Sequence, residues 1–341
     1  MKLKLLVVLA AMGMATNAMA VDDCKFIPAT PAQTINSESI LIQLSANAEV
    51  STTNPIGSSI APASLGGKKF RCENKLELWG TRDITNGSLR LYPGNPDFYE
   101  TNLKGIGVRF YAIGPTSLAG AVKLPQISTK YNTKAPEPGD TGIEVDISPS
   151  RFVAHFYKLE KNIDLRPNIY QQKVNIMTPQ IIGDSKVEGK PFLIYNLGNI
   201  ELISVPVCTV DQPQKIDFGT VTADNVRDGA SKDLKFGMLC HTDYGSYNAV
   251  ASINAANRTP DGKFIAVTDV QGNSDSLIIE ITDLAGQQIN VDGSTSRDVL
   301  NVSSGDKAKY EWKAILKQAN GKPAPARGRF KASAIITLDL K

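Results

Sequence analysis

The sequence predicts an all-β protein built from two β-sandwich domains in tandem. Three observations lead to this fold class: short runs in which apolar and polar residues alternate, turn residues that recur between the runs, and one pair of cysteines in each half of the chain. A hydrophobic content of 42% allows each half to bury a core. No stretch has the periodicity of a helix longer than one or two turns.

Strand-like runs follow one another along the whole chain. In each run Val, Ile, Phe or Thr alternates with polar residues, and Gly, Pro, Asn and Asp clusters separate the runs. In the first part of the chain the runs are Ser39–Leu44, Gly87–Leu91, Gly107–Ile113, Phe152–Tyr157 and Pro191–Tyr195. In the later part they are Ala249–Ile253, Lys263–Thr268, Ser276–Ile281 and Tyr310–Leu316.

The first twenty residues have the pattern of a secretory signal peptide. Lys2 and Lys4 precede the apolar run Leu5–Ala11, and Ala18-Met19-Ala20 is a small-x-small cleavage site. This run is too short to span a bilayer, which takes about 20 apolar residues, and no other stretch approaches that length. We therefore expect residues 1–20 to be removed and the mature protein to be soluble outside the cytoplasm.

The four cysteines indicate disulfides, because an even number of cysteines in a secreted chain is typical of paired thiols. Four cysteines allow three pairings, and the spacing favours Cys24–Cys72 with Cys208–Cys240, since each bridge then closes a loop within one half of the chain. By chain entropy each bridge would contribute about 4 kcal/mol. A metal site is the weaker interpretation, because the chain has no Cys-x-x-Cys and only two histidines.

Removal of the signal peptide leaves about 320 residues, which suggests two domains at about 150 residues each. The extended segment Gly198–Cys208 leads directly into the second cysteine pair, so the boundary is placed near Val205, with residues 21–203 in one domain and 204–341 in the other. The linker is short, so we expect limited swing between stacked domains. The net charge of +3 points to neither nucleic acid nor an anionic membrane as a partner.

Ser128–Gly142 is the longest convincing surface loop, rich in Thr, Lys, Pro and Gly. Loops of this length on a rigid scaffold often carry binding residues, and a plain long connection is the alternative interpretation.

The chain closes with a period-2 pattern over Gly328–Lys341. Its apolar face consists of Phe330, Ala332, Ala334, Ile336, Leu338 and Leu340. The other face is polar except for Ile335. Six covered apolar side chains would contribute about 10 kcal/mol, comparable with the stability of a whole domain. From the pattern alone, either the strand is paired within its own chain, or the domain must borrow a strand from a partner.

Several segments of the second domain carry a family resemblance. Cys208-Thr-Val opens its first strand, Ile216–Val221 follows, and Cys240 ends Leu234–Cys240. Gly328 stands fourteenth from the C-terminus, ahead of the alternating strand. Together these features resemble the pilin domain of chaperone–usher fimbrial subunits. Leu340 departs from the tyrosine usual at that position in the family, although it keeps the apolar alternation.

The first domain looks like the receptor-binding domain of two-domain tip adhesins, including those of type 3 and related type 1-like fimbriae. The resemblance lies in Tyr99–Phe110, which contains Gly-Ile-Gly-Val-Arg-Phe, and in an early cysteine followed by another about fifty residues later. It implies a lectin-like, receptor-binding domain followed by an incomplete immunoglobulin-like pilin domain.

The resemblance also implies partners. A periplasmic chaperone would fill the gap left by a missing strand, an outer-membrane usher would export the subunit, and the next subunit would then donate its own strand. The groove would be lined by the six apolar residues of the closing strand. Only Val21, Asp22 and Asp23 separate the cleavage site from Cys24, so the mature chain has no free arm to donate. A subunit that accepts a strand but gives none belongs at the fimbrial tip, on the cell surface.

The sequence offers little support for catalysis. His155 lies in an alternating strand and His241 follows a cysteine, so both are interpreted as structural. Gly105-Ile-Gly107 lacks the further glycine and helix of a nucleotide fingerprint. No spacing favours a particular pair of carboxylates. We therefore predict no enzymatic activity, no cofactor and no metal.

The leading hypothesis is adhesion, in which the first domain binds a host glycan or matrix protein and the second joins it to the fimbria. Carbohydrate sites combine an aromatic face with polar hydrogen-bonding groups. The candidate receptor residues are Trp79, Tyr131 and Asp140. Two alternatives remain: a non-adhesive structural or capping minor pilin, and a secreted polysaccharide hydrolase.

Overall fold

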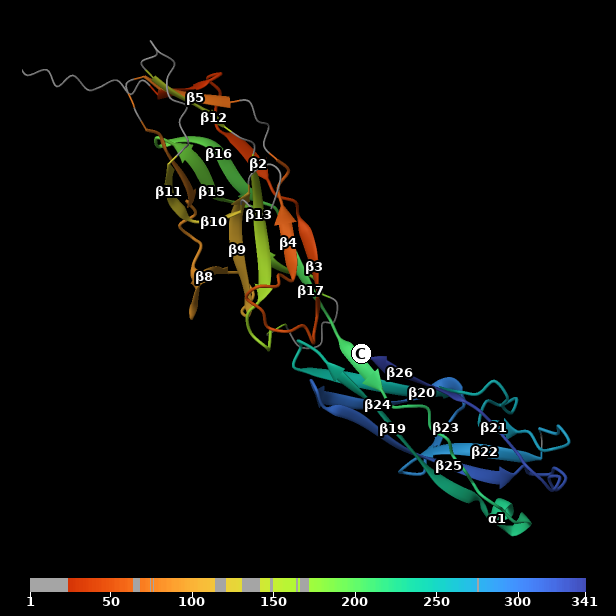
Figure 1. Ribbon diagram of the computed structural model, residues 1–341. Helices are drawn as coiled ribbons and strands as arrows, with labels where there is room; N and C mark the ends of the chain where they lie inside the picture. The colour runs from red at the N-terminus through yellow and green to blue at the C-terminus, as the bar shows by residue number, and fades with distance from the viewer. Residues whose placement is uncertain are drawn as a thin grey trace, which may run out of the picture.

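The structure is a computed structural model, and it confirms the all-β fold class. It describes residues 24–63, 68–73, 75, 77–113, 121–130, 142–147, 150–163, 165, 172–274 and 276–341. Two elongated groups of strands lie end to end (Figure 1). The C-terminus lies in space near the point where the chain passes from the first group to the second. Residues up to Val205 are called the N-terminal half and residues from Val207 onward the C-terminal half.

The described residues of the N-terminal half form four sheets. Two larger sheets have the orders β4-β13-β9-β8-β7, with β10 beside β9, and β11-β6-β15-β16-β2. Two three-stranded sheets have the orders β1-β5-β12 and β14-β17-β3. The strands are β1 Cys24–Ile27, β2 Gln33–Asn36, β3 Ile40–Ser45, β4 Gly57–Ile60, β5 Lys68–Glu73, β6 Trp79–Ile84, β7 Leu91–Tyr92, β8 Asn95–Glu100, β9 Ile106–Ile113, β10 Val122–Lys123, β11 Gln126–Lys130, β12 Gly142–Ile147, β13 Arg151–Lys158, β14 Val174–Met177, β15 Gln180–Val187, β16 Lys190–Leu197 and β17 Ile200–Val205.

The C-terminal half contains two sheets with the orders β18-β19-β25-β22-β21, with β23 beside β22, and β24-β20-β26. A single six-residue helix, α1, lies between β18 and β19. The elements are β18 Val207–Val210, α1 Ala223–Asp228, β19 Ala230–His241, β20 Ser246–Asn254, β21 Phe264–Val267, β22 Leu277–Asp283, β23 Gln288–Ile289, β24 Asp292–Ser303, β25 Lys307–Gln318 and β26 Ile335–Leu340.

Alternation along the strands builds the cores. In β25 the buried residues fall at every second position, from Ala308 through Tyr310 and Trp312 to Leu316, while the residues between them are exposed or half-buried. The rings of Tyr310 and Trp312 pack on the ring of Phe236 in the adjacent β19, with centroid distances of 5.2 Å and 4.8 Å respectively. Such a core stabilises the half by removing about 150–250 Å² of surface per aromatic side chain from water.

Both favoured disulfides are present, and each joins residues that face one another across two antiparallel strands. Cys24 pairs with Cys72 between β1 and β5, and Cys208 pairs with Cys240 between β18 and β19. Each bridge therefore stays within one half, as the spacing predicted.

Two pairings in the N-terminal half are parallel. β16 pairs with β2, and β17 pairs with β3 in register from Ile200 opposite Ile40 to Val205 opposite Ser45. Only Pro206 separates β17 from β18. The chain therefore leaves one half and enters the other without a flexible linker.

Most of the predicted strand runs lie within observed strands or within one or two residues of them, but two are wrong. Gly87–Leu91 is largely a turn, because Asn86 Oδ1 accepts hydrogen bonds from the backbone N–H and the hydroxyl of Ser88. The closing strand is shorter than the pattern suggested and begins only at Ile335. Its neighbour β20 ends at Asn254, opposite Ile335, so the residues before Ile335 have no partner on β20.

Two sequence predictions fall on regions that the structure describes only in part or not at all, and a third is not tested by it. The signal peptide and residues 131–141 of the predicted loop lie outside the described residues, whereas Ser128–Lys130 belong to β11. The domain division at residues 203 and 204 stays a prediction.

Candidate functional site

The first candidate site is the free edge of β26. This strand pairs antiparallel with β20, from Leu340 opposite Ala249 to Ile335 opposite Asn254. It is the last strand of its sheet, and among the described residues no strand pairs with its other edge. An unpaired edge presents a row of backbone N–H and C=O groups to a possible partner strand.

Burial changes abruptly from β20 to β26. On the core-facing side Ala249, Ala251 and Ile253 of β20 are buried, with at most 2% of their surface exposed. Their cross-strand partners on β26 are only half-buried, although they pack against the same core. These partners are Leu340, Leu338 and Ile336. The core is therefore incompletely covered along this edge.

Other half-buried apolar side chains border the same core. They are Ile216, Phe218, Ile279, Val299 and Val302. Phe330 is half-buried against a smaller neighbouring cluster, whereas Ala332 and Ala334 are exposed and precede β26. Of the six residues assigned to the groove, three therefore line the edge of a strand, and the groove itself stays a prediction.

The second candidate site is the face of the β4-β13-β9-β8 sheet that points away from the core. Along β9 the residues Val108, Phe110 and Ala112 are fully buried, and Arg109 and Tyr111 alternate with them. Strand alternation therefore places Arg109 and Tyr111 on the opposite face. This face is called the Arg109 face, and it comprises Asp97, Phe98, Arg109, Tyr111, Lys123, His155 and Tyr157.

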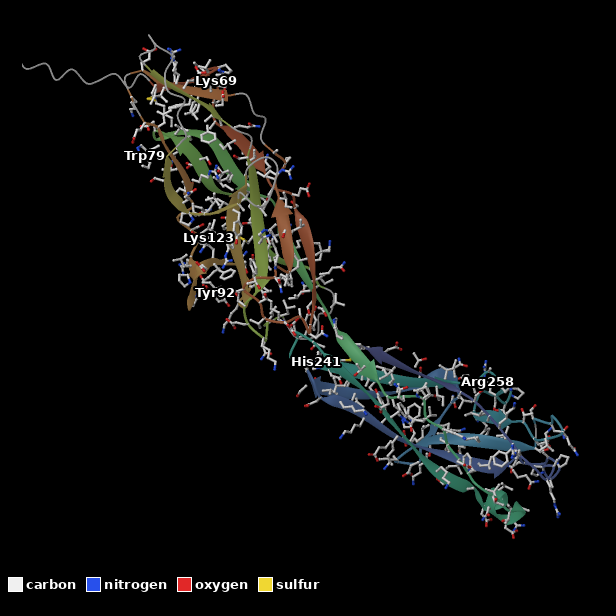
Figure 2. The ribbon with its side chains drawn as sticks, viewed as in Figure 1. Lys69, Trp79, Tyr92, Lys123, His241 and Arg258 are labelled. Atoms are coloured by element: carbon white, nitrogen blue, oxygen red, sulfur yellow. A yellow bond between two sulfur atoms is a disulfide. The ribbon has the colours of Figure 1, made fainter. Side chains whose placement is uncertain are left out.

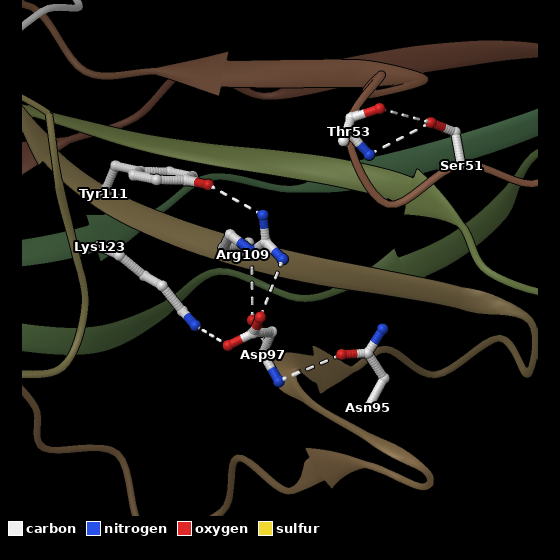
Figure 3. A network of polar contacts seen from close by, with 7 residues as sticks. All are labelled: Ser51, Thr53, Asn95, Asp97, Arg109, Tyr111 and Lys123. Atoms are coloured by element: carbon white, nitrogen blue, oxygen red, sulfur yellow. Dashed lines mark hydrogen bonds and ion pairs between the residues drawn. The ribbon is translucent and has the colours of Figure 1, made fainter.

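Arg109 is at the centre of this face (Figure 3). Its guanidinium carbon lies 4.1 Å from the centroid of the Phe98 ring and 5.5 Å from that of Tyr157. One of its nitrogens donates to the Tyr111 hydroxyl at 3.3 Å, and another lies 3.7 Å from an Asp97 carboxylate oxygen. Aromatic rings and hydrogen-bonding groups thus hold the guanidinium in one place.

A second cation lies close by. Lys123 of β10 forms an ion pair with Asp97, and the hydrogen bond and charge of Lys123 hold the pKa of Asp97 below its ordinary value. Two cations, Arg109 and Lys123, therefore share one carboxylate, which leaves an excess positive charge on this face. Phe98 and Tyr157 are buried, at 0% and 3% exposed, so they position Arg109, and the rings available to a ligand are the half-buried ones of Tyr111 and His155. A charged or hydroxyl-rich ligand would find hydrogen-bond donors beside these two rings.

His155 of β13 extends the aromatic part of this face. Its ring centroid lies 5.3 Å from that of Tyr111, and its Nδ1 is 2.6 Å from the hydroxyl oxygen of Ser58, its cross-strand partner on β4. The pair resembles half of a nucleophile–base arrangement. In the described part of the chain, no carboxylate orients this imidazole, and the charged group acting on it is Arg109. The pair therefore joins two strands rather than activating Ser58.

Protonation of His155 should make stability depend on pH. Burial and then the charge of Arg109 lower the pKa of His155, so the folded protein binds this proton less readily than the unfolded chain, whose histidine pKa is about 6.5. Stability should therefore be greatest above about pH 6.5 and fall as the pH drops toward the folded pKa. The midpoint of urea unfolding of the N-terminal half should decrease between pH 7 and pH 5.

The His155→Gln variant should show a weaker decrease over that range. His241, the only other histidine, lies on β19 in the C-terminal half, so His241→Gln is the matched control. An unchanged pH dependence in His155→Gln would contradict the prediction.

Of the receptor residues predicted from sequence, the structure describes only Trp79, which is not part of this face. Trp79 is 46% exposed and lies on β6 of the other large sheet. Its backbone N–H donates a hydrogen bond to a Glu188 carboxylate oxygen at 2.6 Å. Figure 2 places it nearer than Lys123 to the far end of the N-terminal half. Tyr131 and Asp140 lie outside the described residues. A receptor site at these three residues stays a prediction.

A hollow of about 380 Å³ lies elsewhere on the N-terminal half. It is lined by Ser88, Leu89, Arg90, Glu100, Thr101, Asn102, Met177, Thr178 and Gln180. It has no aromatic side chain on which a sugar ring could stack, so the Arg109 face is the better candidate for a ligand.

One part of the chain matches a known family. Residues 199–341, which contain the free edge of β26, match the family described as Fimbrial protein. The match covers β17 and the C-terminal half. No protein of curated function is similar enough to count as a relative.

Solved structures similar to this chain include three adhesin structures. The receptor binding domain of the adhesin MrkD1P of Klebsiella pneumoniae is 16% identical, with 53% of this chain and 96% of that chain covered and a TM-score of 0.39. A chain of the CsuC–CsuE chaperone–tip adhesion subunit complex of Acinetobacter baumannii is 11% identical, with 93% and 99% covered and a TM-score of 0.40. The CupB6 tip adhesin from Pseudomonas aeruginosa is 13% identical, with 93% and 94% covered and a TM-score of 0.32.

Two features are absent from the part of the chain that the structure describes. None of its helices has the length and apolar composition needed to cross a membrane. Within the same residues, no group of three His, Cys, Asp or Glu side chains is placed to hold a metal ion.

Proposed function

We propose that this protein is a fimbrial subunit and the adhesin at a fimbrial tip, with the N-terminal half binding a receptor and the C-terminal half receiving a strand from its partners. The observation that carries the proposal is the half-covered core beside the free edge of β26. A donated strand would satisfy the backbone groups of that edge and cover Ile336, Leu338 and Leu340. A periplasmic chaperone would supply that strand first, and the next subunit would replace it after export through the usher.

The connection between the halves supports a position at the tip. A subunit within the shaft must offer a free arm ahead of its fimbrial domain. Here the residues directly ahead of β18 form β17, which is already paired with β3 and β14. The segment that would serve as an arm is therefore bound inside the N-terminal half.

The Arg109 face is the proposed receptor site. Arg109 is held by the rings of Phe98 and Tyr157, so little conformational freedom is lost when it binds a ligand. Its excess positive charge favours a receptor bearing carboxylate or sulfate groups, such as an acidic glycan or an acidic stretch of a matrix protein.

The proposal is tested with the full mature chain, bound to its chaperone, on an array of neutral, sialylated and sulfated glycans and matrix proteins. We expect binding, and we expect Arg109→Gln to weaken it about 10- to 100-fold, the loss expected for charge-assisted hydrogen bonds. Arg151→Gln is the matched control, because Arg151 is an exposed arginine of β13 in the same sheet.

The possible outcomes are distinguishable. If the chain binds no receptor, the adhesive role fails and a capping pilin is favoured. If both arginine variants bind as well as the unchanged chain, the adhesive role stands but the Arg109 face is the wrong site.

A further inference from the structure

The two halves of the chain meet around a buried turn. Asp243 and Tyr244 lie between β19 and β20 of the C-terminal half, yet Tyr244 packs within the hydrophobic core of the N-terminal half and is only 3% exposed. Its hydroxyl donates to the carbonyl of Ser204 in β17 at 3.1 Å. A side chain of one half therefore completes the core of the other.

Asp243 forms a buried ion pair across the same junction. Its carboxylate lies 3.7 Å from the ammonium of Lys158, the last residue of β13, and the two side chains are 3% and 1% exposed. The other carboxylate oxygen accepts a hydrogen bond from the Ser204 hydroxyl at 2.6 Å. The ammonium also lies 3.4 Å from the carbonyl of Ala46, which follows β3.

The backbone of the turn is held as well. The carbonyl of Asp243 accepts a hydrogen bond from the N–H of Leu165 at 3.2 Å. The ends of β3, β13 and β17, together with the segment at Leu165, therefore surround a single residue of the C-terminal half. Each contact depends on the position of that half relative to the other.

Burial makes these contacts sensitive to position. Lysine and aspartate are almost never fully buried unless they are paired. Desolvation raises the pKa of Asp243, while the hydrogen bond from Ser204 and the charge of Lys158 act in the opposite direction. A buried pair of this kind adds little net stability, but separating its members leaves an uncompensated charge, which is strongly unfavourable. The favoured orientation of the halves is therefore the one that keeps the pair together.

We infer that the Lys158–Asp243 pair, with Tyr244 beside it, locks the two halves into one rigid body at a fixed angle. The pair fixes the position of one half relative to the other, much as buried polar groups fix the register of helices in coiled coils. The receptor face is then carried in a set direction relative to the strand that joins the chain to its fimbria. The lock operates whatever receptor the N-terminal half binds.

The test measures the distribution of distances between the halves in the full mature chain. Spin labels are attached through unnatural amino acids at Arg90 and Ser274, which are exposed and lie in different halves, and double electron–electron resonance is recorded. The unchanged chain should give one narrow distribution. Lys158→Met, which leaves Asp243 unpaired, should at least double its width.

A matched control and a milder variant make the result decisive. Lys161→Met removes an exposed lysine three residues further along and should keep the narrow distribution. Ser204→Ala removes only the hydroxyl donor to Asp243, so it should still fold and should broaden the distribution less than Lys158→Met. If near-ultraviolet circular dichroism shows that Lys158→Met does not fold, the width of the distance distribution in Ser204→Ala tests the lock instead. A folded Lys158→Met or Ser204→Ala variant with the unchanged width overturns the lock, as does equal broadening in Lys161→Met.

Discussion

Replacing Leu338 with aspartate should abolish co-purification of the protein with the periplasmic chaperone that the proposed function gives it. Leu338 is half-buried on the core-facing side of β26, beside the free edge. A strand added there would enclose the new carboxylate among apolar side chains, at a cost of several kcal/mol, which corresponds to a loss of affinity of about 1,000-fold or more. Ile336→Asp should have the same effect for the same reason.

Thr337→Asp is the matched control, because Thr337 lies between these two residues and points to the exposed face of β26. It introduces the same charge into the same strand, and it should leave the amount of co-purified chaperone unchanged. Normal co-purification of both Leu338→Asp and Ile336→Asp would show that no strand is received at this edge.

The second large effect is expected from adding a strand instead of blocking one. A hairpin turn after Lys341, followed by a strand with alternating apolar residues, would run antiparallel along the free edge of β26. Four or five newly covered apolar side chains, after the entropy of ordering the strand is subtracted, should contribute about 3–5 kcal/mol. The melting temperature measured by calorimetry should rise by about 10 °C or more.

The control carries an added strand of equal length in which serine replaces each apolar residue. It retains the backbone groups but cannot cover the core, so it should shift the melting temperature by only a few degrees. An equal rise with both added strands would mean that the core beside β26 does not need covering.

Local patterns were sufficient to predict much of the fold. The alternation in Tyr310–Leu316 depends only on neighbouring residues, and the observed β25 contains the whole run. The cysteine pairing was also accessible, because each bridge closes a loop within one half. The length of β26 could not be predicted from local patterns, because it depends on where its neighbour β20 ends. That neighbour lies about eighty residues earlier in the chain.

The Arg109 face could not be assembled from the sequence for a similar reason. Asp97, Arg109 and Lys123 come from three different strands, and their proximity depends on the order of β8, β9 and β10 in the sheet. In the sequence Arg109 stands out only as part of a motif, and His155 is interpreted as structural. An aromatic or charged residue that alternates with fully buried neighbours, as Arg109 and Tyr111 do, was the available signal.

The parallel pairing of β3 with β17 determines how the protein would bear tension. β17 continues into β18 with one residue between them. If the protein is the tip adhesin proposed above, a pull from the fimbrial shaft enters the N-terminal half at Val205 and acts along the axis of β17. In this direction the ladder with β3 is loaded in shear, and its hydrogen bonds share the load instead of breaking one after another. We expect this strand pair to hold the receptor-bearing half onto its fimbria while liquid flow drags on the cell.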